Sequence, residues 1–121
     1  MAMGVPTPVL RMFDEAKARE FYCDFLGFTV DWEHRFEDGT PLYMQVRSGT
    51  CVLQLSEHFG DASPGALLRI PVDDLDGFVA ALNAKQYKNA RPGIETQPWG
   101  RECAIRDPFY NRLCFFDAPV P

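Results

Sequence analysis

The sequence predicts an α+β fold, in which two β-α-β-β-β repeats form a mixed concave sheet with the helices on its outer face. Two segments, 13–28 and 73–86, carry hydrophobic residues at helical spacing. Each follows one short apolar segment and precedes three more, which Gly-, Asp- and Pro-containing turns separate. This order occurs twice, over about 60 residues each time. The length of 121 residues suits a single domain, residues 1–121, with repeat halves at about 4–60 and 66–118.

The first half opens with a strand at residues 5–12, where Pro6 and Pro8 limit early pairing and suit an arm that crosses to a second copy of the chain. In the helix that follows, Asp14 is a candidate N-cap and Gly27 can supply the left-handed stop. Three strands complete this half, at residues 28–36, 41–48 and 50–57. A loop at 58–65 leads to the second half.

The second half starts with a strand at 66–72 and a helix whose first turn carries acidic residues, as the helix dipole favours. Its remaining strands are expected at residues 94–99, 101–106 and 111–116. Asp107, Pro108 and Asn111 have the chemistry of a turn, because Asp and Asn side chains bond to nearby backbone and proline fixes a dihedral angle.

Composition excludes several classes of partner. A net charge of −5 argues against binding to nucleic acid or to an anionic membrane. The start has no secretory signal pattern, and no stretch approaches the roughly 20 apolar residues of a membrane span. The four cysteines have no CxxC spacing. We therefore expect a cytoplasmic protein with reduced thiols.

Several segments resemble the vicinal oxygen chelate superfamily, namely LRMFDEAKAREFYCDFLGF (10–28), RDPFYNRLCFF (106–116) and the doubled element order. The superfamily includes glyoxalase I, extradiol dioxygenases, fosfomycin-resistance enzymes and bleomycin resistance proteins. VPTPVL near the start and QPWGRECAIRDPFYN (97–111) are most similar to the bleomycin resistance proteins. The chain departs from that family at Phe109-Tyr110, where a small residue and glycine are common. The resemblance covers almost the whole chain and implies the same fold, a homodimer and a small-molecule ligand.

The resemblance also locates the positions at which the superfamily's enzymes hold a divalent metal through His or Glu. In this chain they fall on Thr7, Gln54, Leu67 and Cys114. Thr, Gln and Leu do not supply an imidazole or carboxylate set, and one thiol does not replace it. The bleomycin resistance proteins lack the metal too. We therefore expect no metal, no other cofactor and no catalytic residue.

Trp99 lies between Pro98 and Gly100 at the entrance of a strand. A tryptophan there could cap the core. The flanking residues also suit the mouth of a site, where a flat indole can stack on a planar heteroaromatic ligand, and the resemblance implies this role. The next two residues, Arg101 and Glu102, form either an exposed ion pair or a polar rim that orients ligand amides.

Further candidates lie on strands and at their ends. An aromatic set on the strand–turn–strand unit 28–48 is either core or a groove wall; it comprises Trp32, Phe36 and Tyr43. Three more candidates lie where a strand gives way to a loop: Glu57, His58 and Phe59. His58 has no acid or nucleophile partner that would make it a catalytic base.

Alternation along the strands, counted from the metal-ligand positions of the superfamily, adds a mainly apolar cavity wall. Its members are Val9, Val52, Gln54, Leu67, Arg69, Cys114 and Phe116. No adjacent cation that would lower the pKa of Cys114 is evident in the sequence, so we expect a passive wall residue.

These observations predict a metal-free binding protein that sequesters a small molecule and so confers resistance, with a bleomycin-type glycopeptide antibiotic as first candidate. Two alternatives stay open. One is a superfamily enzyme, a lyase or dioxygenase, with non-standard metal ligands or no metal. The other is a binder of a different planar metabolite, because fold and cavity do not fix the ligand.

Overall fold

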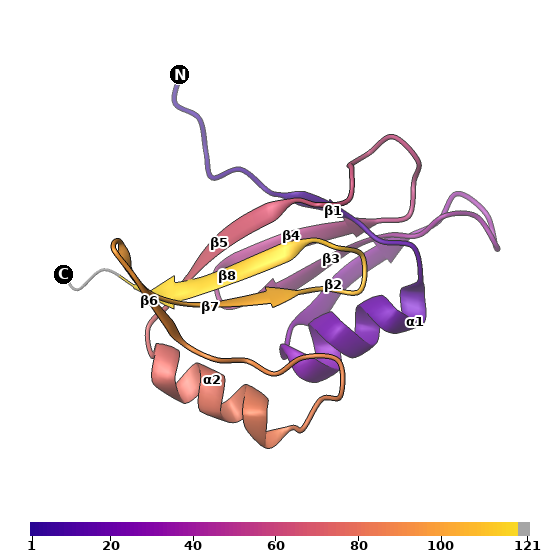
Figure 1. Ribbon diagram of the computed structural model, residues 1–121. Helices are drawn as coiled ribbons and strands as arrows, with labels where there is room; N and C mark the ends of the chain where they lie inside the picture. The colour runs from indigo at the N-terminus through magenta and orange to yellow at the C-terminus, as the bar shows by residue number, and fades with distance from the viewer. Residues whose placement is uncertain (119–121) are drawn as a thin grey trace. The chain divides into compact units, whose positions relative to one another are not determined.

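The computed structural model describes residues 1–118, in which strands and helices follow the predicted order twice (Figure 1). The elements are β1 (Val9–Arg11), α1 (Glu15–Ala18), η1 (Arg19–Phe25), β2 (Thr29–His34), β3 (Tyr43–Ser48), β4 (Cys51–Ser56), β5 (Leu67–Val72), α2 (Leu75–Ala84), β6 (Glu95–Gln97), β7 (Gly100–Arg106) and β8 (Arg112–Asp117). The chain divides into two units, Met1–Pro64 and Gly65–Pro121. Each holds one β-α-β-β-β repeat with its own four-stranded mixed sheet, which confirms the predicted α+β class.

The sheet of the first unit has the strand order β1-β4-β3-β2, with β1 parallel to β4 and the other pairs antiparallel. Successive side chains of a strand point to opposite faces. Met44, Val46, Leu53 and Leu55 are buried on one face, which packs against the helical segment. The residues between them, including Tyr43 and the register pair Gln45–Gln54, lie on the face turned away from the helix.

The predicted helix at 13–28 is present but changes type along its length. Asp14 caps it as predicted, accepting a hydrogen bond from the backbone N–H of Lys17 at 3.0 Å. After Ala18 the turns widen into the π-helical η1. This wider turn places Phe21, Tyr22 and Phe25 together in the core.

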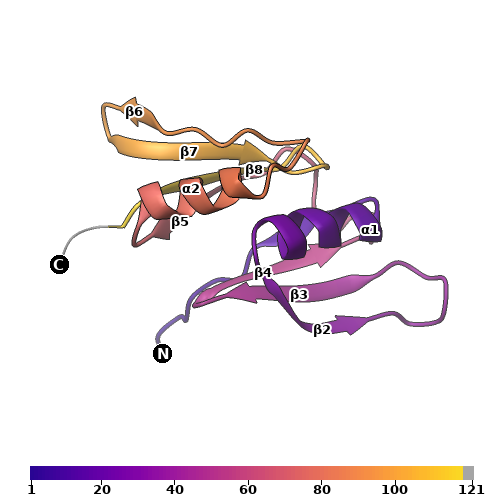
Figure 2. The ribbon, with the colours of Figure 1, turned by 90° about the horizontal axis from the view of Figure 1, so that it is seen from below.

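The sheet of the second unit has the order β5-β8-β7-β6, with β5 parallel to β8. Helix α2 covers one face, where Phe78 packs on Phe115 with 4.6 Å between ring centroids. The other face carries Arg69, Glu102 and Cys114, which alternate with buried neighbours. Figure 2 shows α2 beside the strands of its own sheet.

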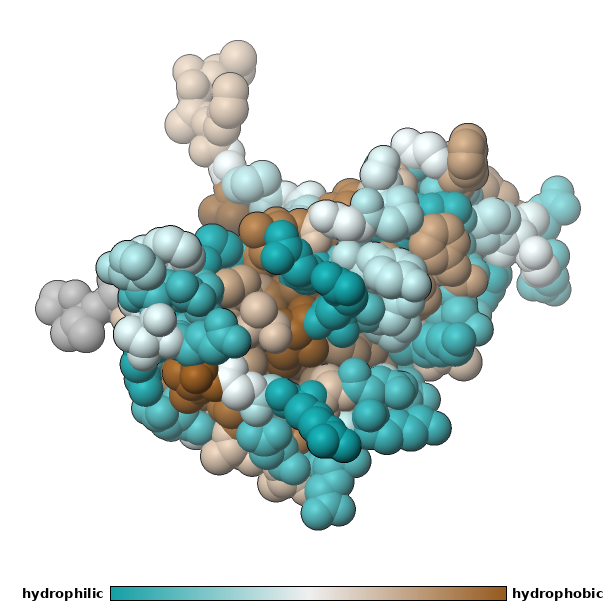
Figure 3. All heavy atoms as spheres, viewed as in Figure 1, coloured by the Kyte–Doolittle hydropathy of each residue, from teal (hydrophilic) through white to brown (hydrophobic). Residues whose placement is uncertain are grey.

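Residues 1–8 precede β1 without regular secondary structure, so the first strand starts at Val9 rather than at residue 5. Prolines at positions 6 and 8 explain the delay, because proline cannot donate to a strand ladder. The segment joins the sheet at the carbonyl of Pro8, which accepts from the N–H of Gln54 at 2.9 Å. Figure 3 shows the start of the chain as pale brown spheres that project from the surface around them. Within residues 1–118, no helix has the length and apolar character needed to cross a membrane.

Candidate functional site

Trp99 lies in the turn of the β6–β7 hairpin. Gln97 pairs with Gly100, so Pro98 and Trp99 form the two-residue loop between the strands. Gly100 has a φ of 132°, a conformation that favours glycine. The Trp99 residue is 67% exposed, which rules out the alternative that this tryptophan caps the core.

The carboxylate of Glu102 gathers three donors on one oxygen. Oε2 accepts from Nη1 of Arg69 at 2.8 Å, from Sγ of Cys114 at 2.9 Å and from Nε1 of Trp99 at 3.3 Å. The Glu102 side chain is only 13% exposed. The indole of Trp99 is therefore tethered at its N–H edge while its ring remains open to solvent.

The surroundings of Glu102 and Cys114 set the protonation state of each side chain. The hydrogen bond from Cys114 and the guanidinium of Arg69 lower the pKa of Glu102, so it is ionised at neutral pH. Burial, followed by the neighbouring Glu102 carboxylate, raises the pKa of the Cys114 thiol to about 11. Contrary to the sequence-based expectation, a cation is adjacent, since Nη1 of Arg69 lies 3.4 Å from Sγ. The thiol nevertheless remains a neutral donor, as a wall residue would.

Arg101 points the other way. Its guanidinium binds both carboxylate oxygens of Asp76 on α2, at 3.1 and 2.9 Å, and also Asp117 at 2.9 and 3.2 Å. Because neighbours on a strand face opposite sides of a sheet, only Glu102 of this predicted pair joins the cluster around Trp99. Arg101 instead ties α2 to β7 and β8.

The first unit carries a second aromatic surface. Trp32 stacks on Tyr43 with 5.8 Å between centroids and an interplanar angle of 7°. His58 packs on Phe36 at 6.0 Å and lies 6.4 Å from Tyr43, and His34 packs edge-on against Phe36 at 4.9 Å. Phe36 is 75% exposed and Trp32 41% exposed, so the predicted set is a surface cluster rather than core.

A chain of polar side chains runs beside this cluster. The hydroxyl of Tyr43 donates to Gln54, and Gln54 donates to Gln45 at 2.9 Å. Gln45 and Arg47 both donate to Oδ2 of Asp31, at 2.9 and 3.0 Å. Asp31, Gln45 and Arg47 were not among the predicted site residues. Gln45 and Arg47 lie two and four residues after Tyr43 on the same strand, so alternation places all three on one face and could have identified them as site residues.

The remaining predicted site residues are less favourably placed to contact a ligand. Glu57 accepts from the backbone N–H of Leu42 at 3.0 Å, which is a bond within the fold. Phe59 is almost fully exposed in the loop after β4, and Leu67 is 52% exposed on β5. Phe116 lies under the guanidinium of Arg69, 4.6 Å from its ring centroid. Val9 is paired with Gln54, and Val52 lies two residues from Gln54 on β4.

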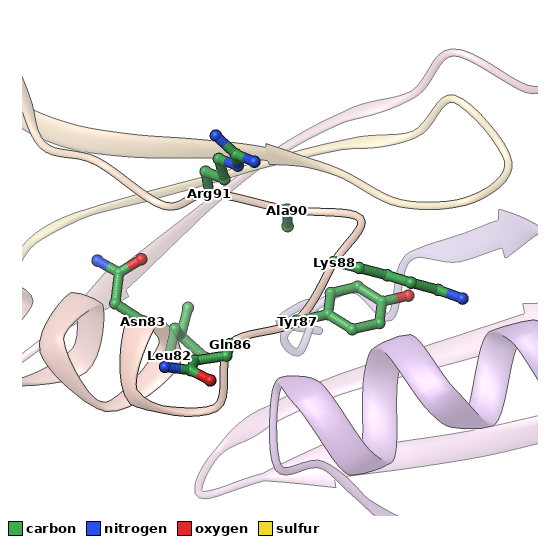
Figure 4. Close-up of a pocket in the computed structure, with 7 residues that line it drawn as sticks. All are labelled: Leu82, Asn83, Gln86, Tyr87, Lys88, Ala90 and Arg91. Atoms are coloured by element: carbon green, nitrogen blue, oxygen red, sulfur yellow. The ribbon is translucent and has the colours of Figure 1, made fainter.

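A cavity of about 330 Å³ lies at the C-terminal end of α2, and none of its lining residues is among the predicted site residues. Its lining residues are Leu82, Asn83, Gln86, Tyr87, Lys88, Ala90 and Arg91. Figure 4 shows that the side chains of Lys88 and Arg91 point in different directions. The cavity therefore does not present converging charges to a ligand.

The residues at the superfamily's metal-ligand positions do not fit a divalent metal. Leu67 offers no donor atom, both polar ends of the Gln54 amide are already hydrogen-bonded, and the single thiol of Cys114 does not replace an imidazole and carboxylate set. Within residues 1–118, no three or more His, Cys, Asp and Glu side chains are grouped so that they could hold a metal ion. These positions supply no step of metal chemistry.

The two repeats and their sites define a protein of the vicinal oxygen chelate fold. A family model described as "Glyoxalase superfamily protein" matches residues 3–119, and the chain belongs to this superfamily. A search of curated proteins found no match.

Solved structures of antibiotic-binding proteins are similar to the chain. The antibiotic-binding protein TnmS3 from Streptomyces sp. CB03234 has a TM-score of 0.76 and 25% identity, over 98% of this chain and 99% of that one. A bleomycin-binding protein from Streptomyces verticillus, solved with copper(II)-bleomycin, has a TM-score of 0.67 and 26% identity, over 98% and 100%. A bleomycin resistance determinant encoded on the transposon Tn5 has a TM-score of 0.74 and covers 98% and 100%. At 23% identity, this last likeness shows the fold alone.

Proposed function

We propose that this protein binds a small molecule through a planar aromatic group that stacks on the indole of Trp99. The observation that carries the proposal is the exposed ring of Trp99, held in a hairpin turn by its hydrogen bond to Glu102. Tryptophan is enriched at binding surfaces because its ring offers a large apolar face while its N–H keeps a hydrogen-bond partner, as the indole of Trp99 does here. Holding the ring in place before binding also lowers the entropy that a ligand must overcome.

Glu102 supplies the polar part of this site. All three donors reach Oε2, and no group within residues 1–118 donates to Oε1. This second oxygen can accept from an amide or amine N–H of a ligand whose ring lies on Trp99. Arg69, Cys114 and Phe116 then form the wall beside it.

An antibiotic is the ligand class that we propose, with a bleomycin-type glycopeptide as first candidate. Support comes from two solved structures that are at least 25% identical to the chain, one of an antibiotic-binding protein and one of a bleomycin-binding protein. The donor set at the metal-ligand positions favours sequestration over metal-dependent catalysis. A binder of another planar metabolite would use the same contacts.

We further propose that the protein acts as a homodimer, with residues around Pro6 and Pro8 crossing to the second copy. Residues 1–7 are all exposed and include three large apolar side chains, Met1, Met3 and Val5. An apolar arm without a covering partner in its own chain suits an exchange with a two-fold mate.

The test is Trp99→Ala, with bleomycin affinity and melting temperature measured on the same protein. Loss of a stacking ring costs about ten- to a hundredfold in affinity. Because Trp99 is mostly exposed, its removal should change the free energy of unfolding by no more than about 0.5 kcal/mol. A lower melting temperature with unchanged affinity would refute the stacking role.

Trp32→Phe is the matched control, since the chain contains only two tryptophans. This variant should keep most of the fluorescence quenching that ligand causes, and Trp99→Ala should lose it. If the wild type binds no bleomycin but binds another planar heteroaromatic compound, the stacking role stands and the drug assignment fails.

A further inference from the structure

Two arginines face each other at the turn end of the β7–β8 hairpin. Arg106 and Arg112 are direct register partners, and both are exposed. By strand alternation they lie on the sheet face that carries Glu102 and Cys114. Within residues 1–118, neither forms an ion pair or a hydrogen bond through its side chain.

This arrangement contrasts with that of five of the chain's other seven arginines. These five pair with acidic side chains: Arg19, Arg35, Arg47, Arg69 and Arg101. Like charges directly opposite each other destabilise a sheet. The carboxylate of the adjacent Asp107 accepts hydrogen bonds from the backbone of Phe109 and from the backbone and side chain of Asn111.

Apolar surface borders the two cations. Leu67, which is 52% exposed, is the register partner of Arg112 on β5. Leu67, Arg112 and Arg106 therefore lie side by side across β5, β8 and β7. Along both β7 and β8, the arginine lies four residues from the Glu102–Phe116 register pair, which corresponds to about 13 Å. The cluster around Glu102 and the arginine pair thus lie on one face of one sheet.

We propose that Arg106 and Arg112 bind an oxyanion of the ligand, a carboxylate, sulfate or phosphate group about 13 Å from the end held at Glu102. Guanidinium groups bind such oxygens through paired N–H donors. One anion bound between the two arginines would also neutralise their charges and so remove the repulsion between them. The link to an aromatic ligand rests on the proposed function; the oxyanion site itself does not require Trp99. A ligand that uses both ends of this face is therefore an elongated aromatic compound with an anionic group at its far end, whereas bleomycin, which has no carboxylate, sulfate or phosphate group, would use the Trp99–Glu102 end alone.

Inorganic sulfate tests the site independently of Trp99. Backbone amide resonances of residues 105–113 are followed while sodium sulfate is added, with sodium chloride at equal ionic strength as reference. The wild type should show saturable shifts with sulfate, and Arg106→Gln or Arg112→Gln should weaken the apparent affinity at least threefold. Lys88→Gln removes the same charge from an exposed side chain outside this pair and should leave the affinity unchanged.

The two arginine variants should fold, because losing one charge relieves the repulsion; melting temperatures at or above that of the wild type would agree. Equal shifts with chloride, or sulfate binding that survives both arginine variants, would overturn the site.

A second experiment tests whether the arginine pair and Trp99 bind the same ligand. A naphthalimide dye with a chain long enough to span about 13 Å is prepared with a terminal carboxylate and with a terminal carboxamide. Binding is read from the quenching of Trp99. The carboxylate form should bind at least fivefold more tightly, and the double variant Arg106→Gln/Arg112→Gln should lose this preference. Equal affinities in the wild type would refute the anionic ligand class, whereas sulfate binding without quenching by either dye would support the oxyanion site and refute stacking.

Discussion

Glu102→Gln tests the charge arrangement beneath Trp99. The substitution preserves the shape of the side chain and removes the negative charge 2.9 Å from the Cys114 thiol. Two effects of that charge raise the thiol pKa, and the adjacent Arg69 opposes them. Burial, the largest cause of the raised pKa, is unchanged by the substitution. The variant should therefore have a lower thiol pKa that still exceeds the ordinary value.

The size of the effect follows from the ionised fraction. With a pKa of about 11, Cys114 is ionised in roughly 0.3% of molecules at pH 8.5. Removing one charge at hydrogen-bond distance is expected to lower the pKa by about one unit, which raises the thiolate fraction about tenfold. A less basic thiolate is a weaker nucleophile, by about threefold per unit. The net gain in alkylation rate is about threefold.

The assay is alkylation by iodoacetamide at pH 8.5, with the modification of each cysteine quantified by peptide mass spectrometry. Glu95→Gln is the matched control, because Glu95 is the register partner of Glu102 on β6 and has no bond to Cys114. It should leave the rate at Cys114 unchanged. A rate at Cys114 that is unchanged or slower in Glu102→Gln would refute the described cluster.

Three further outcomes are expected. Asp107→Ala leaves two buried N–H groups and the amide of Asn111 without their acceptor, so the free energy of unfolding in urea should fall by about 3 kcal/mol, and no loss would contradict the turn as described. Removing residues 1–7 keeps the Pro8–Gln54 bond but should weaken dimerisation by light scattering, and a full-length monomer at micromolar concentration would contradict the dimer. Protein purified without a metal-binding tag should hold well below one equivalent of Zn, Mn, Fe or Ni, and near-stoichiometric metal that resists chelation would revive the enzyme alternative.

The fold could be predicted because its signals are local. Asp14 caps the first helix and Gly27, with a φ of 84°, ends it, as their chemistry indicates. The π-helical turn could not be predicted in this way. It arises because Phe21, Tyr22 and Phe25 all pack into one core, and that packing depends on residues distant in sequence.

The site was predictable only in part. The flanks of Trp99 indicated an exposed ring, but treating Arg101 and Glu102 as one pair ignored alternation, which sends them to opposite faces. The register shift between Val30 and Trp32 turns Asp31 and Trp32 to the same face, and no sequence pattern marks it.

The arginine pair could have been found from the sequence. By strand alternation, Arg106 lies on the same sheet face as Glu102, and Arg112 lies on the same face as Cys114. What the sequence does not reveal is that both arginines lack an acidic partner among the residues that the structure describes.

The indole N–H resonance of Trp99 gives the most direct test of the central claim that a planar ligand stacks on this ring. The two tryptophans give two indole signals, and Trp32→Phe assigns them. On titration with bleomycin, the Trp99 indole signal should shift upfield and saturate with the same dissociation constant as the fluorescence quenching. A Trp99 signal that stays in place while bleomycin is bound at saturation would contradict the account.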